Sequence, residues 1–372
     1  MWSKRMLDSL MKRIPLMLNT PGEREKWSYD YGVVLKGAEL VWKMTGEQKY
    51  FDYIYDNLTS FINEDGTIEN YKLEIFNIDH VSNGKSLLTL YEETKEERFK
   101  IAVDLLRNQL RFHPQTKEGV FWHKLVYPHQ VWLDGLYMGA PFYAEYIKKF
   151  GSRDEFDHVA IQFIYCAKNA KDTETGLLYH AYDEKREQPW CNKETGLSEN
   201  FWGRAMGWFV VGLVDTISHF PESHNKIEAL KTILVETLSA LRNVQSEEGV
   251  WYQVLDKGNK KGNYLEASAS CMILYAITKA INMHILDDSW VKTASRAYYG
   301  IIDEFVLITK EGLANLNKTC MVAGLGGATK RDGSYTYYIS EPIIVNDQKG
   351  LGAFIMAMAE YEKLAEVMGL QL

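Results

Sequence analysis

Carboxylate, histidine and arginine side chains lie beside tryptophans at several points in this chain, a combination that suits recognition of a polar sugar. Flat aromatic rings stack on pyranose faces, and carboxylates and histidines form hydrogen bonds with hydroxyl groups. The most informative carboxylate is Asp134, which follows Trp132 and Leu133 and precedes Gly135. Apolar neighbours that partly remove a carboxyl from water raise its pKa and equip it to donate a proton. The alternative is that Asp134 is an N-terminal helix charge favoured by the helix dipole.

Four more polar residues are candidates for contacts with a substrate: Asp79, His123, Lys124 and His180. From the sequence alone, Asp79 fits the role of a helix N-cap more readily than a role in a site. The two histidines could equally be loop residues whose hydrogen bonds are satisfied within the protein.

Arg204 lies between Trp202 and Trp208 in a glycine-rich segment. This setting suits bidentate binding of a carboxylate by the guanidinium group, although a structural ion pair is the alternative. Trp132 and Trp208 are substrate-contact candidates that could instead belong to the core, which is the commoner position for tryptophan. Tyr31, at the start of a predicted helix, is a further candidate for substrate binding.

Two kinds of turn alternate along the chain and place these candidates in a repeated framework. The first kind is a glycine turn with a polar lead-in, and its glycines are separated by 53, 57, 73 and 63 residues: Gly66, Gly119, Gly176, Gly249 and Gly312. The second kind is a short polar turn near the midpoint between two glycine turns, as at residues 45–47 and 94–96. A period of about 60 residues built from two turns predicts repeated helical hairpins.

The segments between the turns have the three- and four-residue periodicity of amphipathic helices, as in Leu106 and Leu110. We expect twelve helices, near residues 3–17, 31–43, 49–62, 81–93, 97–112, 130–149, 155–170, 201–219, 225–243, 265–283, 289–306 and 347–366. Twelve helices in six hairpins predict an all-α protein with an (α/α)6 barrel, formed as one catalytic domain over residues 1–372. A superhelical solenoid is the alternative architecture, but its repeats are usually shorter.

Small residues indicate which helices form the inner ring of such a barrel. The predicted helices after the long, aromatic-rich connections contain small residues, such as Gly135 and Gly139, or the residues of 267–270. Glycine weakens a helix by about 1 kcal/mol relative to alanine, so it is retained where helices approach closely. We therefore expect the N-termini of these helices and the long connections to share one rim, where a site can form.

Composition narrows the classes of function. The chain has 372 residues, 46% of them hydrophobic, and a net charge of −8, with no basic block to neutralise nucleic-acid phosphates. The N-terminal segment is interrupted by charges such as Lys4 and Arg5, and no apolar run is long enough to span a membrane. The four cysteines are scattered, and metal and nucleotide motifs are absent. We expect a cytoplasmic protein with buried thiols, no cofactor, no metal and no obligate protein partner.

Four segments resemble glycoside hydrolase family 105, the unsaturated rhamnogalacturonyl hydrolases. Residues 129–142 (HQVWLDGLYMGAPF) resemble the family's WLDGLYMG segment, and residues 119–124 (GVFWHK) resemble its GGFWHK loop. Residues 179–184 (YHAYDE) resemble YHAWDE, and residues 201–208 (FWGRAMGW) resemble FWARSIGW. The motifs agree in order and spacing from Trp27 to Gly350, and residues 321–347 match the family least.

The resemblance implies an (α/α)6 barrel that acts on small sugars released by polysaccharide lyases. The family's general acid/base falls on Asp134, and a second aspartate near the reaction centre falls on Asp79. The pocket positions of the motifs fall on His123, His180, Arg204 and Trp208. The implied reaction is hydration of the C4=C5 double bond of an unsaturated uronyl residue. Asp134 would donate the proton and then accept one from water.

Further roles follow from this implied reaction. Asp79 would hold ring hydroxyls or the water, and Arg204, with Lys124, would receive the uronate carboxylate. A related unsaturated glucuronyl hydrolase that acts on glycosaminoglycan fragments or other unsaturated uronides is the first alternative. A barrel epimerase that uses His123 and His180 as paired bases is the second, and a non-catalytic sugar-binding protein is the third.

Overall fold

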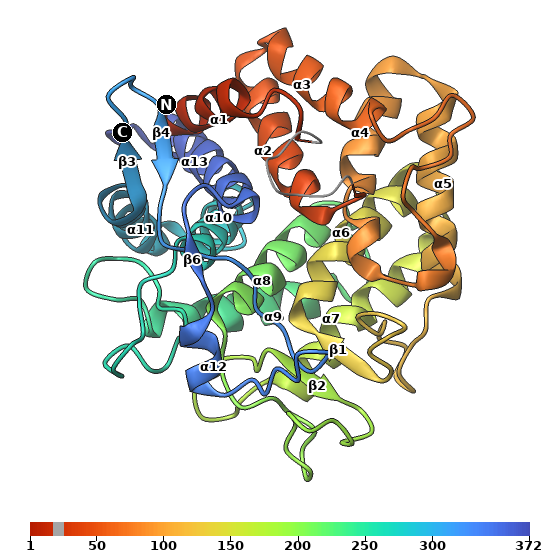
Figure 1. The fold of residues 1–372 in the computed structure, drawn as a ribbon, viewed down its shortest axis with the longest axis vertical. Helices are drawn as coiled ribbons and strands as arrows, with labels where there is room; N and C mark the ends of the chain where they lie inside the picture. Colours follow the sequence, from red (N-terminus) through yellow and green to blue (C-terminus); the bar gives the residue numbers. More distant parts are fainter. Residues whose placement is uncertain (18–25) are drawn as a thin grey trace.

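The computed structural model describes residues 1–17 and 26–372, and twelve long α-helices in these ranges form two concentric rings (Figure 1). The inner ring consists of α2 (Tyr29–Thr45), α4 (Gly84–Thr94), α6 (Leu133–Phe150), α8 (Gly203–Ile217), α10 (Ala267–Asn282) and α13 (Gln348–Met368). The outer ring consists of α1 (Trp2–Arg13), α3 (Gln48–Thr59), α5 (Glu97–Phe112), α7 (Phe156–Ala170), α9 (Ile227–Asn243) and α11 (Val291–Phe305). Each inner helix packs against the next, and α13 closes the ring between α10 and α2. This arrangement confirms the (α/α)6 barrel.

The inner helices are buried on nearly all sides, whereas the outer helices expose one face. Every residue of α8 is buried, but α11 buries only one stripe, which includes Ala294, Ala297 and Ile301. Close packing in the inner ring depends on small residues. A Cβ atom at Gly352 of α13 would lie 2.6 Å from the backbone carbonyl carbon of Val33 in α2. The glycines therefore mark the inner helices, where neighbouring backbones are too close for a side chain, as predicted.

The connections from outer to inner helices are long, and those from inner to outer helices are short. Each of the five predicted turn glycines occurs in a long connection and has a φ between 75° and 86°. Side chains rarely adopt this left-handed conformation, so glycine is the residue that permits the turn. The long connections and the N-termini of the inner helices consequently meet at one end of the barrel, which we call the rim.

Short antiparallel strands in the long connections correct some predicted helix boundaries. The strand β1 (Gln130–Trp132) pairs with β2 (Ala181–Asp183), so α6 begins at Leu133 and not at residue 130. Ladder hydrogen bonds hold residues 130–132 extended, which excludes them from the helix. The last long connection contains β3 (Val306–Ile308), β4 (Ala314–Leu316), β5 (Thr319–Cys320), the short helix α12 (Tyr335–Ser340) and β6 (Ile343–Ile344). The sequence did not predict α12.

Two layers of side chains follow the barrel axis below the rim. The apolar layer is closely packed, with only about 10 Å³ open to the centre of a water molecule, and it contains Val33, Tyr137, Trp208, Val211, Met272, Tyr275, Ala353 and Met356. Lys85 Nζ lies 3.4 Å from the centre of the Tyr137 ring, where a charged layer begins. The charged layer includes Lys36, Glu39, Lys85, Asp215 and Lys279. The apolar layer separates these charges from the rim.

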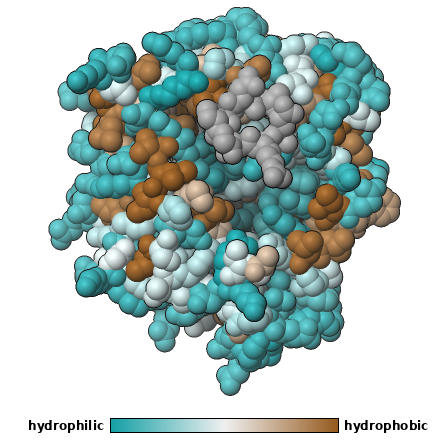
Figure 2. Space-filling view, in the orientation of Figure 1, coloured by the Kyte–Doolittle hydropathy of each residue, from teal (hydrophilic) through white to brown (hydrophobic). Residues whose placement is uncertain are grey.

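The surface on the side seen in Figure 2 is largely hydrophilic, with separate hydrophobic patches. No helix within residues 1–17 and 26–372 is long and apolar enough to cross a lipid bilayer. The four cysteines are buried and are not joined by disulfides.

Candidate active site

The pairing of β1 with β2 brings Asp134 and His180 together. Trp132 lies opposite Ala181 in this ladder, and the Leu133 amide then donates a hydrogen bond to the His180 carbonyl oxygen at 3.0 Å. Asp134 follows in the first turn of α6, where its Oδ2 lies 3.1 Å from His180 Nε2. The imidazole is fully buried, but the Asp134 side chain remains 13% exposed. The carboxyl group therefore has one ordered partner behind it and keeps an accessible side.

Asp79 is the second carboxylate of the site and forms an ion pair with Lys124. It lies in the short 3-10 helix η3 (Ile78–Val81), whose N-cap is Asn77 and not Asp79. Lys124 Nζ lies 2.7 Å from Asp79 Oδ2, and His123 Nε2 lies 3.7 Å from Oδ1. Burial alone would raise the pKa of Asp79, but the charge of Lys124 and the neighbouring His123 outweigh it, and the pKa is lowered. Asp79 is therefore a carboxylate at neutral pH.

His123 and Trp132 are stacked on each other, with ring centres 4.5 Å apart and planes 10° apart. Tyr127 adds a third ring, 5.1 Å from Trp132 and nearly parallel to it. Burial lowers the pKa of His123 to about 4, so this histidine is neutral at neutral pH. Trp132 also turns an edge toward His180 at 5.4 Å. The Trp132 ring thus holds both histidines in place from within the protein.

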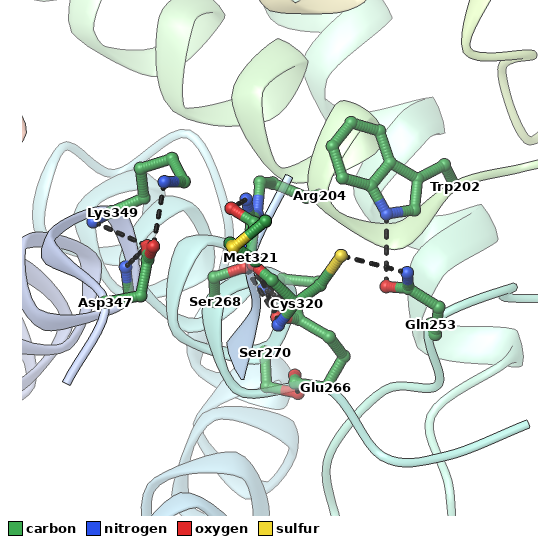
Figure 3. Close-up of polar contacts among 12 residues, drawn as sticks. Trp202, Arg204, Gln253, Glu266, Ser268, Ser270, Cys320, Met321, Asp347 and Lys349 are labelled. Atoms are coloured by element: carbon green, nitrogen blue, oxygen red, sulfur yellow. Dashed lines mark hydrogen bonds and ion pairs between the residues drawn. The ribbon is translucent and has the colours of Figure 1, made fainter. Parts of the chain in front are cut away.

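Arg204 lies in a buried network beneath the rim (Figure 3). Its side chain is only 1% exposed, and its Nη2 lies 3.5 Å from Glu266 Oε1. Its Nε donates a hydrogen bond to Ser268 Oγ at 2.7 Å. The two Nη atoms donate to the backbone carbonyl oxygens of Cys320 and Met321. Arg204 therefore forms a structural ion pair, which was the alternative to binding a substrate carboxylate. Its N–H groups donate to atoms of the protein.

Tyr31 and Trp208, two of the predicted substrate contacts, are core residues in this structure. Tyr31 is 3% exposed and packs against Phe61, with ring centres 5.8 Å apart. Trp208 is 1% exposed and stacks on Tyr137 in the apolar layer. Both residues therefore belong to the buried part of the barrel, and their contact with a substrate stays a prediction.

Tyr29 also lies near the carboxylates, and the sequence analysis did not single it out. Burial, followed by the charges of Asp30, Asp79 and Asp134, raises the pKa of its hydroxyl far above the ordinary value. Its ring also lies 6.2 Å from that of Trp208. Tyr29 and Tyr31 both lie in the first turn of α2. Only the direction in which each side chain leaves the helix distinguishes the residue near the carboxylates from the core residue.

Tyr338 is another residue of the site that the sequence analysis missed. Its Oη lies 2.7 Å from His180 Nδ1, on the other side of the imidazole from Asp134. It belongs to α12, within the connection that resembles family 105 least. No local pattern around Tyr338 indicates this contact.

The site can transfer a proton and hold a polar ligand with its own side chains. Asp134 offers one accessible carboxyl group, while Asp79, Lys124 and Tyr29 offer hydrogen-bond acceptors and donors beside it. Within the two described ranges of the chain, no three histidine, cysteine, aspartate or glutamate side chains converge as metal ligands.

Comparison with known proteins gives a consistent assignment along the chain. A family model described as Glycosyl Hydrolase Family 88 matches residues 2–365. Protein Atu3128 of Agrobacterium fabrum is 36% identical over 234 residues, which make up 61% of this chain and all of that protein. The unsaturated rhamnogalacturonyl hydrolase YesR of Bacillus subtilis is 28% identical over 257 residues, covering 68% of this chain and 70% of YesR.

Solved structures show the same similarity. A family 105 glycoside hydrolase from C. acetobutylicum superposes with a TM-score of 0.94 at 55% identity, covering 97% of this chain and 99% of that one. The unsaturated glucuronyl hydrolase of Bacillus sp. GL1 superposes with a TM-score of 0.70 at 13% identity, covering 97% and 95% of the two chains. The second similarity is one of fold alone.

Proposed function

This chain belongs to glycosyl hydrolase family 88, whose model spans residues 2–365, and we propose that it is an unsaturated rhamnogalacturonyl hydrolase. Its substrate is a small oligosaccharide left by a rhamnogalacturonan lyase, with a 4,5-unsaturated uronyl residue at the non-reducing end. The observation that carries the proposal is Asp134, an accessible carboxyl backed by buried His180 at 3.1 Å. We further propose that residues 1–372 act as one catalytic domain in pectin degradation, in the cytoplasm.

The reaction begins with transfer of a proton from Asp134 to C4 of the unsaturated sugar. The C4=C5 double bond is a vinyl ether with the ring oxygen, so its electron pair forms the new C4–H bond. C5 becomes an oxocarbenium-like centre, and Asp134 becomes a carboxylate. The N-terminus of α6 stabilises that negative charge by about 0.3–1 kcal/mol.

Water then adds to C5, and Asp134 accepts a proton from it. The resulting hemiketal opens by breaking the bond between C5 and the ring oxygen, which leaves a ketone at C5. C1 then carries a hydroxyl group and the glycosidic oxygen, and this hemiacetal breaks down to release the second sugar. One carboxyl group serves both proton transfers.

Asp79 has a binding role in this scheme. Ordinary glycosidases use two carboxyl groups that flank the anomeric carbon, one of them often protonated. The lowered pKa of Asp79, which Lys124 and His123 cause against the effect of burial, keeps it ionised. Asp79 therefore accepts hydrogen bonds from ring hydroxyls or from the attacking water.

Lys124 is the better placed of the two cations to receive the uronate carboxylate. Its side chain is 23% exposed, whereas that of Arg204 is 1% exposed. Lys124 can interact with a second carboxylate while it remains beside Asp79, because an ammonium group has three donors. Arg204 supports the site from below by holding the backbone at residues 320–321.

The test is incubation of the protein with unsaturated rhamnogalacturonan disaccharide in D₂O, followed by ultraviolet absorbance and product NMR. We expect loss of the absorbance of the conjugated double bond and one solvent deuteron at C4 of the product. The Asp134→Asn variant should do neither. Near-native turnover by that variant would show that Asp134 is not the proton donor.

Other outcomes of the same experiment distinguish the alternative functions. Turnover of unsaturated chondroitin disaccharide, but not of the rhamnogalacturonan disaccharide, would indicate an unsaturated glucuronyl hydrolase. A product that keeps its glycosidic bond would indicate an epimerase. Binding without any change in absorbance would indicate a non-catalytic sugar-binding protein.

A further inference from the structure

His180 is held between two side chains that come from distant parts of the chain. Its Nε2 lies 3.1 Å from Asp134 Oδ2, and its Nδ1 lies 2.7 Å from Tyr338 Oη. His180 and Tyr338 are both fully buried. Each ring nitrogen therefore has one partner, and the state of one nitrogen constrains the other.

Two neutral tautomers of His180 can satisfy these contacts, and they differ in the position of the Asp134 proton. If Nδ1 carries the hydrogen, Nε2 has a lone pair that accepts the proton of Asp134 in a hydrogen bond. That proton then points toward His180 and away from a substrate. If Nε2 carries the hydrogen, it donates to Asp134 Oδ2, and the acidic proton is left on Oδ1.

We propose that Tyr338 is a positioning residue that donates its hydroxyl hydrogen to His180 Nδ1 and so holds the imidazole as the Nε2–H tautomer. His180 then donates to Asp134 Oδ2 throughout the reaction. The proton of Asp134 stays on the other oxygen, from which it reaches C4 of the substrate. This inference rests on the proposed function of Asp134 as the acid.

The surroundings of Tyr338 suit a fixed hydrogen-bond donor. Its backbone carbonyl oxygen accepts a hydrogen bond from Gln253 Nε2 at 3.0 Å, and Gln253 Oε1 accepts one from the Trp202 indole at 3.1 Å. The link between Trp202 and Gln253 is drawn in Figure 3. Trp202 also stacks with the Tyr338 ring, 6.0 Å between centres and 24° between planes. These contacts leave the hydroxyl group aimed at His180.

The protonation of Tyr338 agrees with this role. Burial raises the pKa of its hydroxyl well above the ordinary value, and the nearby Tyr337 and Asp134 act in the same direction. The hydroxyl therefore keeps its hydrogen across the neutral range. A tyrosine that stays protonated can donate to Nδ1 throughout that range.

The first experiment measures the His180 tautomer directly. Protein labelled with ¹⁵N at histidine shows distinct nitrogen shifts for the two neutral tautomers, and His180→Gln identifies the signals of His180 by their loss. We expect the Nε2–H tautomer in the wild-type protein. An Nδ1–H tautomer or an imidazolium at neutral pH would overturn the proposal, whatever substrate the enzyme proves to use.

The second experiment compares Tyr338→Phe with Tyr337→Phe on the same short helix. Tyr338→Phe removes only the hydroxyl group, so we expect kcat to fall about tenfold, with KM within about twofold of wild type. The His180 nitrogen shifts should move toward the other tautomer. Tyr337 accepts from the Gly324 amide at 3.0 Å and does not contact His180, so Tyr337→Phe should change neither.

The outcomes of these experiments separate the positioning role from the proposed function. Wild-type kcat and unchanged His180 shifts in Tyr338→Phe would overturn the positioning role. If the wild-type protein consumed no unsaturated uronide, the proposed function would fail, while the tautomer measurement would still decide the arrangement at His180. If Tyr338→Phe did not fold, the measurement on the wild-type protein would still decide it.

Discussion

The rim and the charged layer on the barrel axis contain the same kinds of residues in different surroundings. At the rim, Asp134 and Lys124 remain partly exposed, and each has an ordered partner on one side only. In the charged layer, Asp215 is buried, and its Oδ1 accepts hydrogen bonds from Lys279 at 2.6 Å and Tyr275 at 2.8 Å. A charged group with an accessible side can bind and react, whereas a charged group enclosed by protein mainly affects stability.

The electrostatics of the two regions follow from this difference. Burial lowers the pKa of Lys85 in the charged layer to about 7, although Asp215 acts to raise it. At the rim, the effect of burial on Asp79 is outweighed by Lys124 and His123, and its pKa is lowered. Burial alone therefore disfavours the charged form of a side chain, while a close partner of opposite charge stabilises it.

The largest effect in the comparison is expected for Asp134→Asn. General acid catalysis contributes about 10²–10⁴-fold, so kcat should fall by about 10³-fold, while the free energy of unfolding changes by less than about 1 kcal/mol. Glu97→Gln is the matched control, because Glu97 is an exposed carboxylate in the first turn of the outer helix α5. If both variants lost stability equally and both kept activity, Asp134 would be only a helix charge.

Asp215→Asn should have the opposite pair of effects, a loss of stability with little change in kcat. It leaves the partly buried Lys279 with a weaker partner and alters the buried Asp215 side chain, so the free energy of unfolding should fall by about 3 kcal/mol, as measured by urea denaturation. The folded variant should retain near-native kcat, because the apolar layer separates Asp215 from the rim. Asp104→Asn, which weakens a more exposed pair with Lys100 in α5, should cost less than about 1 kcal/mol. Equal losses in the two variants would contradict the distinction between enclosed and exposed pairs.

Lys124→Met tests which cation binds the uronate. Loss of a charge-assisted hydrogen bond costs about 1.5–3 kcal/mol, so KM should rise about tenfold or more, with a smaller change in kcat. Steady-state kinetics on the unsaturated disaccharide measure both constants. Lys117→Met, in the same long connection, is the control and should behave like wild type. An unchanged KM in Lys124→Met would indicate that Arg204, and not Lys124, binds the uronate carboxylate.

Lys85→Met should change how stability depends on pH. The unfolded chain keeps the lysine proton up to a pKa of 10.5, but the folded protein releases it above about 7. Between these values the unfolded state binds more protons, so Lys85 makes the folded protein more stable as pH rises, by about 1.4 kcal/mol per pH unit at most. Denaturation at pH 7 and pH 9 should show a smaller rise in Lys85→Met than in wild type. Lys100→Met, at a partly exposed lysine of the outer helix α5, is the control and should match wild type.

Several elements of the fold and the site could be predicted because their signals are local. The turn glycines, the helical periodicity and the small residues of the inner helices each report the conformation or crowding of the residues that carry them. Asp134 was identifiable for the same reason, since its position between apolar residues and a glycine-rich helix is visible in a short segment. The start of α6 was misplaced because β2, some 50 residues away, holds residues 130–132 extended.

Local signals in the sequence specify the repeat of helices, the end of the barrel where the long connections meet, and the segment that carries the proposed acid. The pairing of side chains across the site depends on the closed fold. Tyr338 is 158 residues from His180, and Cys320 is 116 residues from Arg204. Periodicity indicates which face of a helix is buried, but it does not indicate which residues pack against that face. Those partners are set when six hairpins close into a ring and bring distant connections together at the rim.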